Sequence, residues 1–277
     1  MLHTTLTDAN FKADLHTHTI YSDGDVTPQE LLKLAQSKAI NAISITDHDT
    51  ILAYFEETTI PLAKELNIML IPGIELSTEY DNHSIHVLGY NIDIHSSHLQ
   101  HHLQLAKQRK DMRNEEIIKK LQNKGMDISM QDVYNLFPQL HNKIFNRSHI
   151  ALTMVKKGYV KTYKEAFHNY IKEHGCCYVA GEKISVEEAI GVIHVAKGKA
   201  VLAHPHLLQK KQILTKLLEM NFDGIEIYYS HYKKLKIPKT QKKLIYTGGS
   251  DYHGTIRPLA HIGCSLTPKD QFEALLA

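Results

Sequence analysis

The stretch Asp14-Leu15-His16-Thr17-His18 decides how the rest of this sequence is interpreted. An apolar run at residues 11–16 predicts a short strand that leads into it. Because side chains at positions i and i+2 of an extended chain share a face, His16 and His18 can bind one cation together. A lone His-x-His pair is often structural, so its role has to be inferred from the residues around it.

Strand-like and helix-like patterns alternate on both sides of a long central segment. Thr27-Pro28-Gln29-Glu30 is a capping box with proline in the first helical turn, and an apolar helical face follows it. Strands are predicted at residues 11–16, 42–46, 68–72, 85–90, 200–203, 224–229 and 245–247. Repeated strand–helix units predict an α/β fold with a parallel sheet, either open or closed into a barrel.

The central segment, residues 96–181, lacks strand signals. A long charged amphipathic pattern covers residues 99–124, and Ser129 and Thr162 each begin a further helical pattern. The sequence therefore predicts two parts. Residues 1–95 and 182–277 carry the predicted sheet, and residues 96–181 form a helical insertion domain.

The composition is typical of an ordinary globular protein, with 277 residues, 43 % hydrophobic and 22 % charged. A formal net charge of +2 argues against a strong overall field for nucleic acid or membranes. Three cysteines give no disulfide framework, and neither a signal-peptide pattern nor an apolar run of roughly 20 residues is present. We therefore expect a cytoplasmic protein with no membrane contact and no obligate protein partner.

Metal-competent side chains recur where the predicted strands end. Besides His16 and His18, they are Asp23, His48, Glu75, His86, His204, Asp251 and His253. Each alone is weak evidence, because a strand-end Asp is usually a cap or turn residue and a lone His is usually structural. Strand ends of an α/β fold meet at one edge, where sites are built, so their joint recurrence predicts a shared site for more than one metal.

The chemistry of these side chains limits the metal. Nitrogen and oxygen ligands without a thiolate favour Mn²⁺, Zn²⁺ or Fe²⁺, and the many imidazoles disfavour Mg²⁺ and Ca²⁺. Nine ligands exceed the needs of one ion, and a carboxylate such as Glu75 can bridge two. Two or three neighbouring divalent ions, with Mn²⁺ expected first, are the usual device for in-line displacement at phosphorus.

These segments together resemble the PHP (polymerase and histidinol phosphatase) family, and the resemblance covers nearly the whole chain. It rests on Asp14 to His18, Ser22-Asp23-Gly24, Thr46-Asp47-His48, Gly73-Ile74-Glu75, Ala203-His204-Pro205 and Gly249-Ser250-Asp251-Tyr252-His253. It implies that residues 1–95 and 182–277 form a distorted seven-stranded β/α barrel with a trinuclear metal site, and that the insertion at residues 96–181 caps the substrate. The implied ligands are His16, His18, Glu75 and Asp251 for the first metal; Glu75, His86 and His204 for the second; Asp23, His48 and His253 for the third.

The insertion narrows the resemblance to one branch. Asn146-Arg147-Ser148-His149 is similar to the segment found in bacterial nucleoside-3′,5′-bisphosphate phosphatases and 5′→3′ exoribonucleases of the RNase AM type, with Ser148 at a usual proline position. The resemblance implies that Arg147 and His149 face the substrate phosphate or the leaving group. The plainer alternatives are an exposed salt bridge for Arg147 and a helix-start histidine for His149.

The expected activity is hydrolysis of a phosphate monoester or terminal phosphodiester of a nucleotide by a metal-bound hydroxide. The expected substrates are a nucleoside 3′,5′-bisphosphate and short 5′-phosphorylated RNA, degraded 5′→3′. Two alternatives stay open. A histidinol-phosphate phosphatase shares the motifs but usually lacks an Arg-x-His insertion of this kind, and a non-catalytic regulatory module does not need so complete a ligand set.

Overall fold

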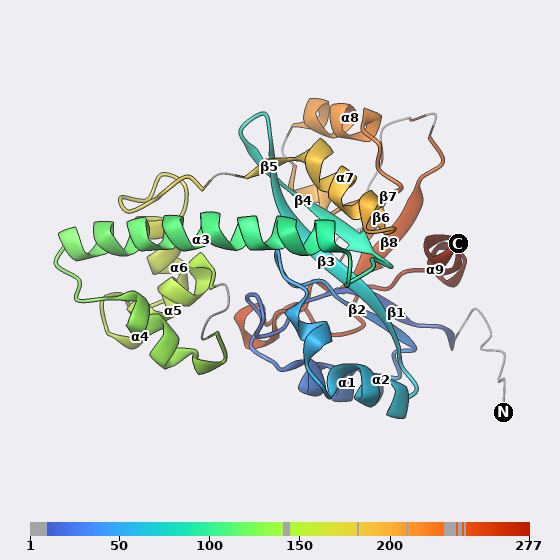
Figure 1. The fold of residues 1–277 in the computed structure, drawn as a ribbon, viewed down its shortest axis with the longest axis horizontal. Coiled ribbons are helices and arrows are strands. Elements are labelled where there is room, and N and C mark those ends of the chain that lie inside the picture. Colours follow the sequence, from blue (N-terminus) through green and yellow to red (C-terminus); the bar gives the residue numbers. More distant parts are fainter. Residues whose placement is uncertain are drawn as a thin grey trace.

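The computed structural model describes residues 10–140, 145–181, 183–208, 210–229, 237, 240 and 242–277 (Figure 1). Its strands are β1 (Ala13–Thr17), β2 (Ala42–Ile45), β3 (Met69–Tyr80), β4 (His83–Tyr90), β5 (Ile184–Ser185), β6 (Lys199–Leu202), β7 (Gly224–Tyr229) and β8 (Ile245–Gly249). Its α-helices are α1 (Pro28–Ser37), α2 (Thr59–Glu65), α3 (Ser97–Asn123), α4 (Met130–Leu136), α5 (Arg147–Lys156), α6 (Tyr163–Ala166), α7 (Val186–Val195), α8 (Lys211–Glu219) and α9 (Lys269–Leu276).

Seven strands form a nearly closed, barrel-like sheet in the order β1-β2-β3-β4-β6-β7-β8, and the short β5 pairs with β3 beside this path. The segment after β8 returns to β1, since the Asp251 N–H donates to the His16 carbonyl and the His18 N–H donates to the Tyr252 carbonyl. The predicted distorted seven-stranded barrel is therefore confirmed.

The prediction of a purely parallel sheet is wrong at β4, which runs antiparallel to both neighbours, β3 and β6. β3 and β4 form a hairpin whose two loop residues, Asp81 and Asn82, have φ angles of 49° and 59°. Two positive φ angles are those of the turn that suits the twist of a two-residue hairpin, and Asp and Asn tolerate them. No helix separates these strands, so the chain reverses instead of crossing over.

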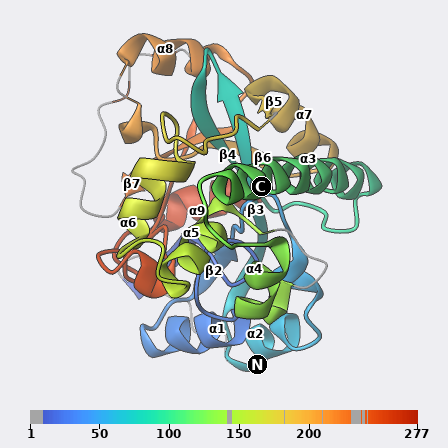
Figure 2. The same ribbon diagram turned by 90° about the vertical axis from the view of Figure 1, so that its left-hand side faces the viewer.

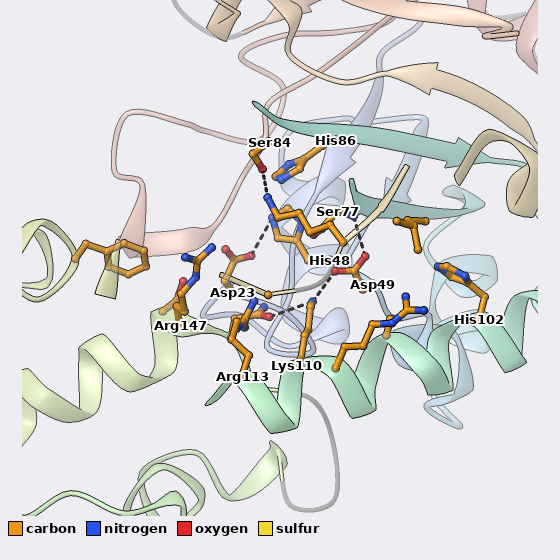
Figure 3. A pocket seen from close by; sticks show the side chains of 18 of the residues that line it. Asp23, His48, Asp49, Ser77, Ser84, His86, His102, Lys110, Arg113 and Arg147 are labelled. Carbon is orange, nitrogen blue, oxygen red and sulfur yellow. Dashed lines mark hydrogen bonds and ion pairs between the residues drawn. The ribbon is translucent and has the colours of Figure 1, made fainter. Parts of the chain in front are cut away.

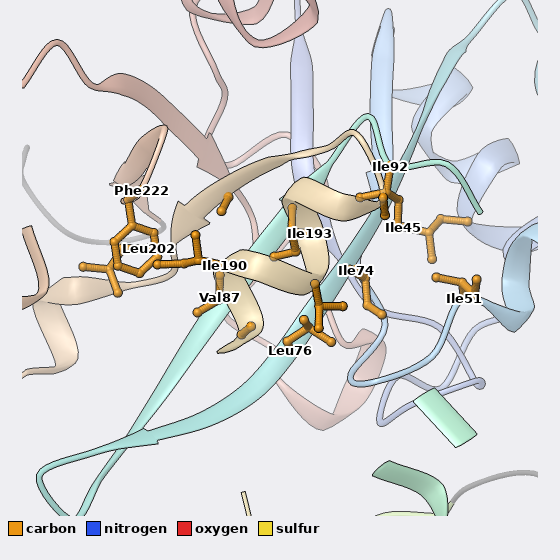
Figure 4. Close-up of a cluster of buried hydrophobic side chains, with 14 of the residues drawn as sticks. Ile45, Ile51, Ile74, Leu76, Val87, Ile92, Ile190, Ile193, Leu202 and Phe222 are labelled. Carbon is orange, nitrogen blue, oxygen red and sulfur yellow. The ribbon is translucent and has the colours of Figure 1, made fainter. Parts of the chain in front are cut away.

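Helices cover the two sides of the sheet, as Figures 1 and 2 show, with α1 and α2 on one side and α7 and α8 on the other. The capping box predicted at Thr27 is present, because its hydroxyl accepts from the Glu30 N–H at 3.1 Å. Ile190 and Ile193 of α7 belong to the main hydrophobic cluster together with Leu76 and Val87 of the hairpin (Figure 4).

The helices α3 to α6 project to one side of the barrel (Figure 1). A second hydrophobic cluster lies within them, from Ile117 to Val179. Helix α3 contributes side chains to both hydrophobic clusters, since Leu99 near its start belongs to the main cluster and Ile117 belongs to the second. The division into a barrel and an insertion at residues 96–181 stays a prediction, which the separate clusters support. No helix among the described residues is long and apolar enough to cross a membrane.

Tyr54 holds the strand that leads to the site. Its buried hydroxyl accepts from the Gly73 N–H at 2.8 Å and lies 2.7 Å from the Ile45 carbonyl, between β2 and β3. Pro72, paired with Ile45 in the sheet, has no N–H of its own. The phenol therefore supplies a donor where the β3 backbone has none.

We predict that Tyr54→Phe lowers the free energy of unfolding by about 2 kcal/mol, because it leaves buried backbone groups unpaired. Urea denaturation measures the change. Tyr246→Phe is the matched control, because the hydroxyl of this half-buried residue makes no hydrogen bond to a described residue, and it should stay within about 0.5 kcal/mol of the parent. Equal effects of the two substitutions would contradict the role given to Tyr54.

Candidate metal centre

His16 and His18 lie fully buried at the end of β1. Thr17 between them points the other way, and its hydroxyl donates to the Ser44 carbonyl at 2.7 Å. A Cβ at Gly249 of β8 would come within 2.4 Å of the His16 Cβ and backbone nitrogen. Glycine is therefore required there for β8 to pack against the strand that carries the His-x-His pair.

The Glu75 carboxylate from β3 is the centre of the site. Its Oε1 lies 2.8 Å from His86 Nδ1 and 3.0 Å from His204 Nε2. On its other side, Oε2 lies 3.2 Å from the Nε2 of His16 and 3.3 Å from each of two further ring nitrogens, His18 Nε2 and His48 Nδ1. Five imidazoles thus converge on one carboxylate, whose two oxygens face different groups of rings.

Two aspartates complete the cluster. The Oδ1 of Asp23 lies 3.2 Å from His253 Nε2 and 3.8 Å from His48 Nε2. The Oδ1 of Asp251 lies 3.2 Å from His18 Nε2 and 3.4 Å from His253 Nδ1. The structure therefore brings together all nine side chains that the sequence singled out as ligands.

Three groups within this cluster have ligand atoms close enough to hold an ion, with all atoms of a group within 4.8 Å of one another. They are His18, Asp23, His48 and His253; His16, His18 and Glu75; His48, Glu75 and His86. The first two groups largely follow the division implied by the family resemblance. The third contains His48 where the resemblance has His204, so the assignment of ligands to individual ions stays a prediction.

The buried nitrogen and oxygen atoms fit a metal site. Four of them make no hydrogen bond to a described residue: His18 Nε2, Asp23 Oδ1, His48 Nδ1 and His253 Nε2. Buried polar atoms are normally hydrogen-bonded, so such a group needs an explanation. Divalent cations that accept imidazole and carboxylate ligands would satisfy all four atoms at once.

Burial and the charges within the cluster strongly shift the pKa values of its side chains. Burial alone would raise the pKa of the Glu75 carboxyl, but the imidazoles that face it hold it well below its usual range. Burial lowers the pKa of His48 to about 3, which keeps that ring neutral, as a ligand must be. The neighbouring Asp251 and Glu75 carboxylates overcome the effect of burial at His18 and raise its pKa to about 9.

Glu226 of β7 is a residue that the sequence reasoning missed. It is buried, its Oε1 lies 2.9 Å from His16 Nδ1, and its Oε2 accepts from the His204 backbone N–H at 2.8 Å. A carboxylate bonded to the far nitrogen of a ligating imidazole fixes the tautomer and the ring orientation. The available signal was a single acidic residue inside the apolar run Ile225-Glu226-Ile227.

Other supporting residues were also not predicted. Asp47 accepts from the Thr19 N–H at 2.8 Å and from the Ser22 hydroxyl at 2.5 Å, which holds the loop that carries Asp23. The second oxygen of Asp251 accepts from the Tyr229 hydroxyl at 2.5 Å and from Arg257. Apart from Asp251 and Arg257, which are six positions apart, the partners lie more than 20 positions apart in the sequence, so no local pattern indicated those contacts.

A cavity of about 290 Å³ opens beside the cluster (Figure 3). Asp23, His48, Asp49 and His86 line it on the barrel side. Six cationic side chains line it as well: Arg109, Lys110 and Arg113 of α3, Arg147 of α5, and Lys183 and Arg257. The cavity thus combines a histidine and carboxylate cluster with a surplus of positive charge.

The two substrate residues predicted on α5 have different positions. Arg147 lines the cavity, with its guanidinium 5.6 Å from the Tyr178 ring centroid. His149 is buried and is not among the lining residues; its Nδ1 accepts from the Asn146 N–H at 2.9 Å, and burial lowers its pKa to about 4. The geometry gives His149 a capping role at the start of α5, and a direct substrate contact stays a prediction.

The cations in the cavity repel one another. Burial, together with the nearby Arg147, lowers the pKa of Arg113 to about 10. Burial and then Arg147 also lower the pKa of Lys183. An anion bound among these three side chains would relieve the repulsion, so the cavity favours a negatively charged ligand.

Comparison with known proteins places this geometry in a family. The PHP domain model matches residues 14–173, which is more than half of the chain. The chain is 32 % identical to the 5′-3′ exoribonuclease Rnm of Salmonella typhimurium, over 90 % of this chain and 88 % of the relative. It is 28 % identical to a 3′,5′-nucleoside bisphosphate phosphatase of Chromobacterium violaceum, over 87 % and 86 % of the two chains.

A solved structure agrees with these relatives. A protein of Bifidobacterium adolescentis, provisionally assigned as a metal-dependent phosphoesterase, superimposes with a TM-score of 0.83 at 25 % identity, covering 96 % of both chains. The fold and the clustered His, Asp and Glu side chains together indicate divalent metal ions. From the match of the family model and the identity to Rnm over nearly its whole length, the chain belongs to the PHP domain family.

Proposed function

We propose that this chain is a metal-dependent phosphoesterase that acts on nucleotides. Its substrates are a nucleoside 3′,5′-bisphosphate, short 5′-phosphorylated RNA degraded 5′→3′, or both. The observation that carries the proposal is the cavity, which is lined by Asp23, His48 and His86 of the nine-residue cluster and by six cationic side chains. The relatives named as an exoribonuclease and a nucleoside bisphosphate phosphatase support the same substrate class.

The nine clustered side chains would hold two or three divalent ions, with Mn²⁺ as the proposed metal and Zn²⁺ or Fe²⁺ as alternatives. Bound ions would supply Lewis acidity and lower the pKa of water to near neutrality. Glu75 would bridge two ions through its two oxygens, and Glu226 would orient His16. Nearby carboxylates raise the pKa of the His16 and His18 rings, so both rings carry a proton before metal binds. Metal binding would therefore require both rings to lose that proton.

Arg147 would hold the phosphoryl oxygens through its two-pronged guanidinium as negative charge shifts during the reaction. His149 has less freedom, since its Nδ1 already accepts from the Asn146 N–H. A neutral ring bonded in this way carries its proton on Nε2, which is the only ring atom left to donate to a phosphate or a leaving oxygen. We therefore assign His149 mainly to holding the start of α5.

The two alternatives carry less support. None of the relatives named above is a histidinol-phosphate phosphatase, and the basic cavity offers more positive charge than one small monoester needs. A non-catalytic module would not require nine converging ligand side chains and a cavity beside them. A cytoplasmic location remains part of the proposal, supported by the Cys176 and Cys177 thiols, which form no disulfide with a described residue and are typical of a reducing compartment.

Metal removal gives the first test of the function. We predict that a chelator abolishes phosphate release from adenosine 3′,5′-bisphosphate and cleavage of short 5′-phosphorylated RNA, and that Mn²⁺ restores the lost activity. The double variant His16→Ala/His18→Ala should stay inactive with Mn²⁺, since it lacks two rings of the cluster. Faster turnover of histidinol phosphate than of both nucleotides would overturn the substrate class.

We predict that Glu226→Gln weakens Mn²⁺ binding by about 10- to 100-fold, because the amide no longer holds His16 in its ligating orientation through a charged contact. Calorimetric titration of metal-free protein measures the affinity. Glu219→Gln, an exposed change on α8, is the matched control and should bind like the parent. Unchanged affinity in Glu226→Gln would show that the carboxylate does not support the metal site.

For Arg147 we predict a graded loss. Arg147→Lys keeps the positive charge but loses the two-pronged guanidinium, and should lower kcat/KM for adenosine 3′,5′-bisphosphate by about tenfold. Arg147→Met loses both and should lower kcat/KM further. Steady-state kinetics at saturating Mn²⁺ distinguishes the two. Parent-like kinetics of Arg147→Met would remove this residue from the substrate site.

A further inference from the structure

Lys110 of α3 lies between the metal cluster and the segment that carries Arg147. Its Nζ lies 2.5 Å from Asp49 Oδ2 and donates to Asn146 Oδ1 at 3.2 Å (Figure 3). The side chains of Lys110 and Asp49 are only 12 % and 5 % exposed. In a buried pair of this kind, the loss of one partner leaves an uncompensated charge.

The Asp49 end of this contact is anchored to the metal cluster. Asp49 follows His48 directly, and its N–H donates to the Glu75 carbonyl at 2.9 Å. Its Oδ1 accepts from the Ser77 N–H at 2.8 Å. The carboxylate that Lys110 contacts is therefore fixed relative to His48 and to the central Glu75.

The other end is anchored to the start of α5. Asn146 precedes Arg147 and is the N-cap of this helix. One turn further along α3, Asn114 donates to the Phe145 carbonyl at 2.6 Å. Residues 110 and 114 share one face of α3, so this face holds Phe145 and Asn146 together.

We propose that Lys110 is a positioning residue that sets the distance between the metal cluster and the Arg147 guanidinium, so that both can hold one phosphoryl group. This inference rests on the proposed function. Lys110 already has a carboxylate partner, whereas the described residues give Arg113, Arg147 and Lys183 no carboxylate within 4.0 Å. Asp49 therefore neutralises the charge of Lys110. Arg113, Arg147 and Lys183 can bind the substrate with their charges.

The test compares three variants with the Mn²⁺-loaded parent protein on adenosine 3′,5′-bisphosphate. Lys110→Met should raise KM by about tenfold and change kcat much less, because substrate holding is lost and the cluster remains. Asp49→Asn/Lys110→Met removes both charges, so its thermal stability should recover relative to Lys110→Met while KM stays raised. In an Arg147→Met background, Lys110→Met should change KM by less than about twofold, since both residues act through one contact.

Lys107→Met is the matched control on the same helix. Lys107 pairs with Asp111 within α3 at 2.5 Å and is not among the residues that line the cavity, so its loss should leave KM unchanged. Recovery of KM in the double variant would overturn the proposal, because Lys110 would then serve only to neutralise Asp49. An equal effect of Lys110→Met with and without Arg147 would also overturn it. Failure of the proposed function is distinguishable, since the parent itself would then turn over no nucleotide.

Discussion

The structure depends on one buried carboxylate, Glu75, that is shared by five imidazoles. Burying this charge is costly unless its partners compensate for it. The rings of His16, His18 and His48 face one oxygen, and those of His86 and His204 face the other. The barrel supplies this arrangement by bringing β1, β3, β4 and the ends of β2 and β6 to one place. Much of the surrounding architecture, from Tyr54 behind β3 to Gly249 beside β1, keeps these segments in register.

The cluster was predictable because it follows from a general property of α/β folds. Side chains such as His48 and His204 stand just after predicted strands, and strand ends meet at one edge of such a fold. His86 lies inside β4 and not after it, so its prediction rested on the joint pattern of metal-competent side chains and on the family resemblance. The direction of β4 was missed because the Asp81–Asn82 turn was not recognised, and with it the hairpin that lengthens β3 to Tyr80.

Supporting residues could not be predicted in the same way. Glu226 contacts His16 across 210 positions of sequence, and Lys110 contacts Asn146 across 36. Neither contact has a local pattern, because it exists only after the sheet closes or the helices pack. His149 shows the converse: a short motif indicated a substrate residue, but the folded helix buries the ring and uses its Nδ1 as a cap. A short motif thus indicated the position of the site more reliably than the role of each side chain in it.

The central claim is that Glu75 joins the ligands of more than one ion. Its most direct test is the number of Mn²⁺ ions bound per chain, measured by elemental analysis after equilibration, in the parent and in Glu75→Gln. The account predicts two or three ions in the parent and a loss of more than one ion in the variant, since its two oxygens face different groups of rings. A single ion in the parent, or full occupancy in Glu75→Gln, would contradict it.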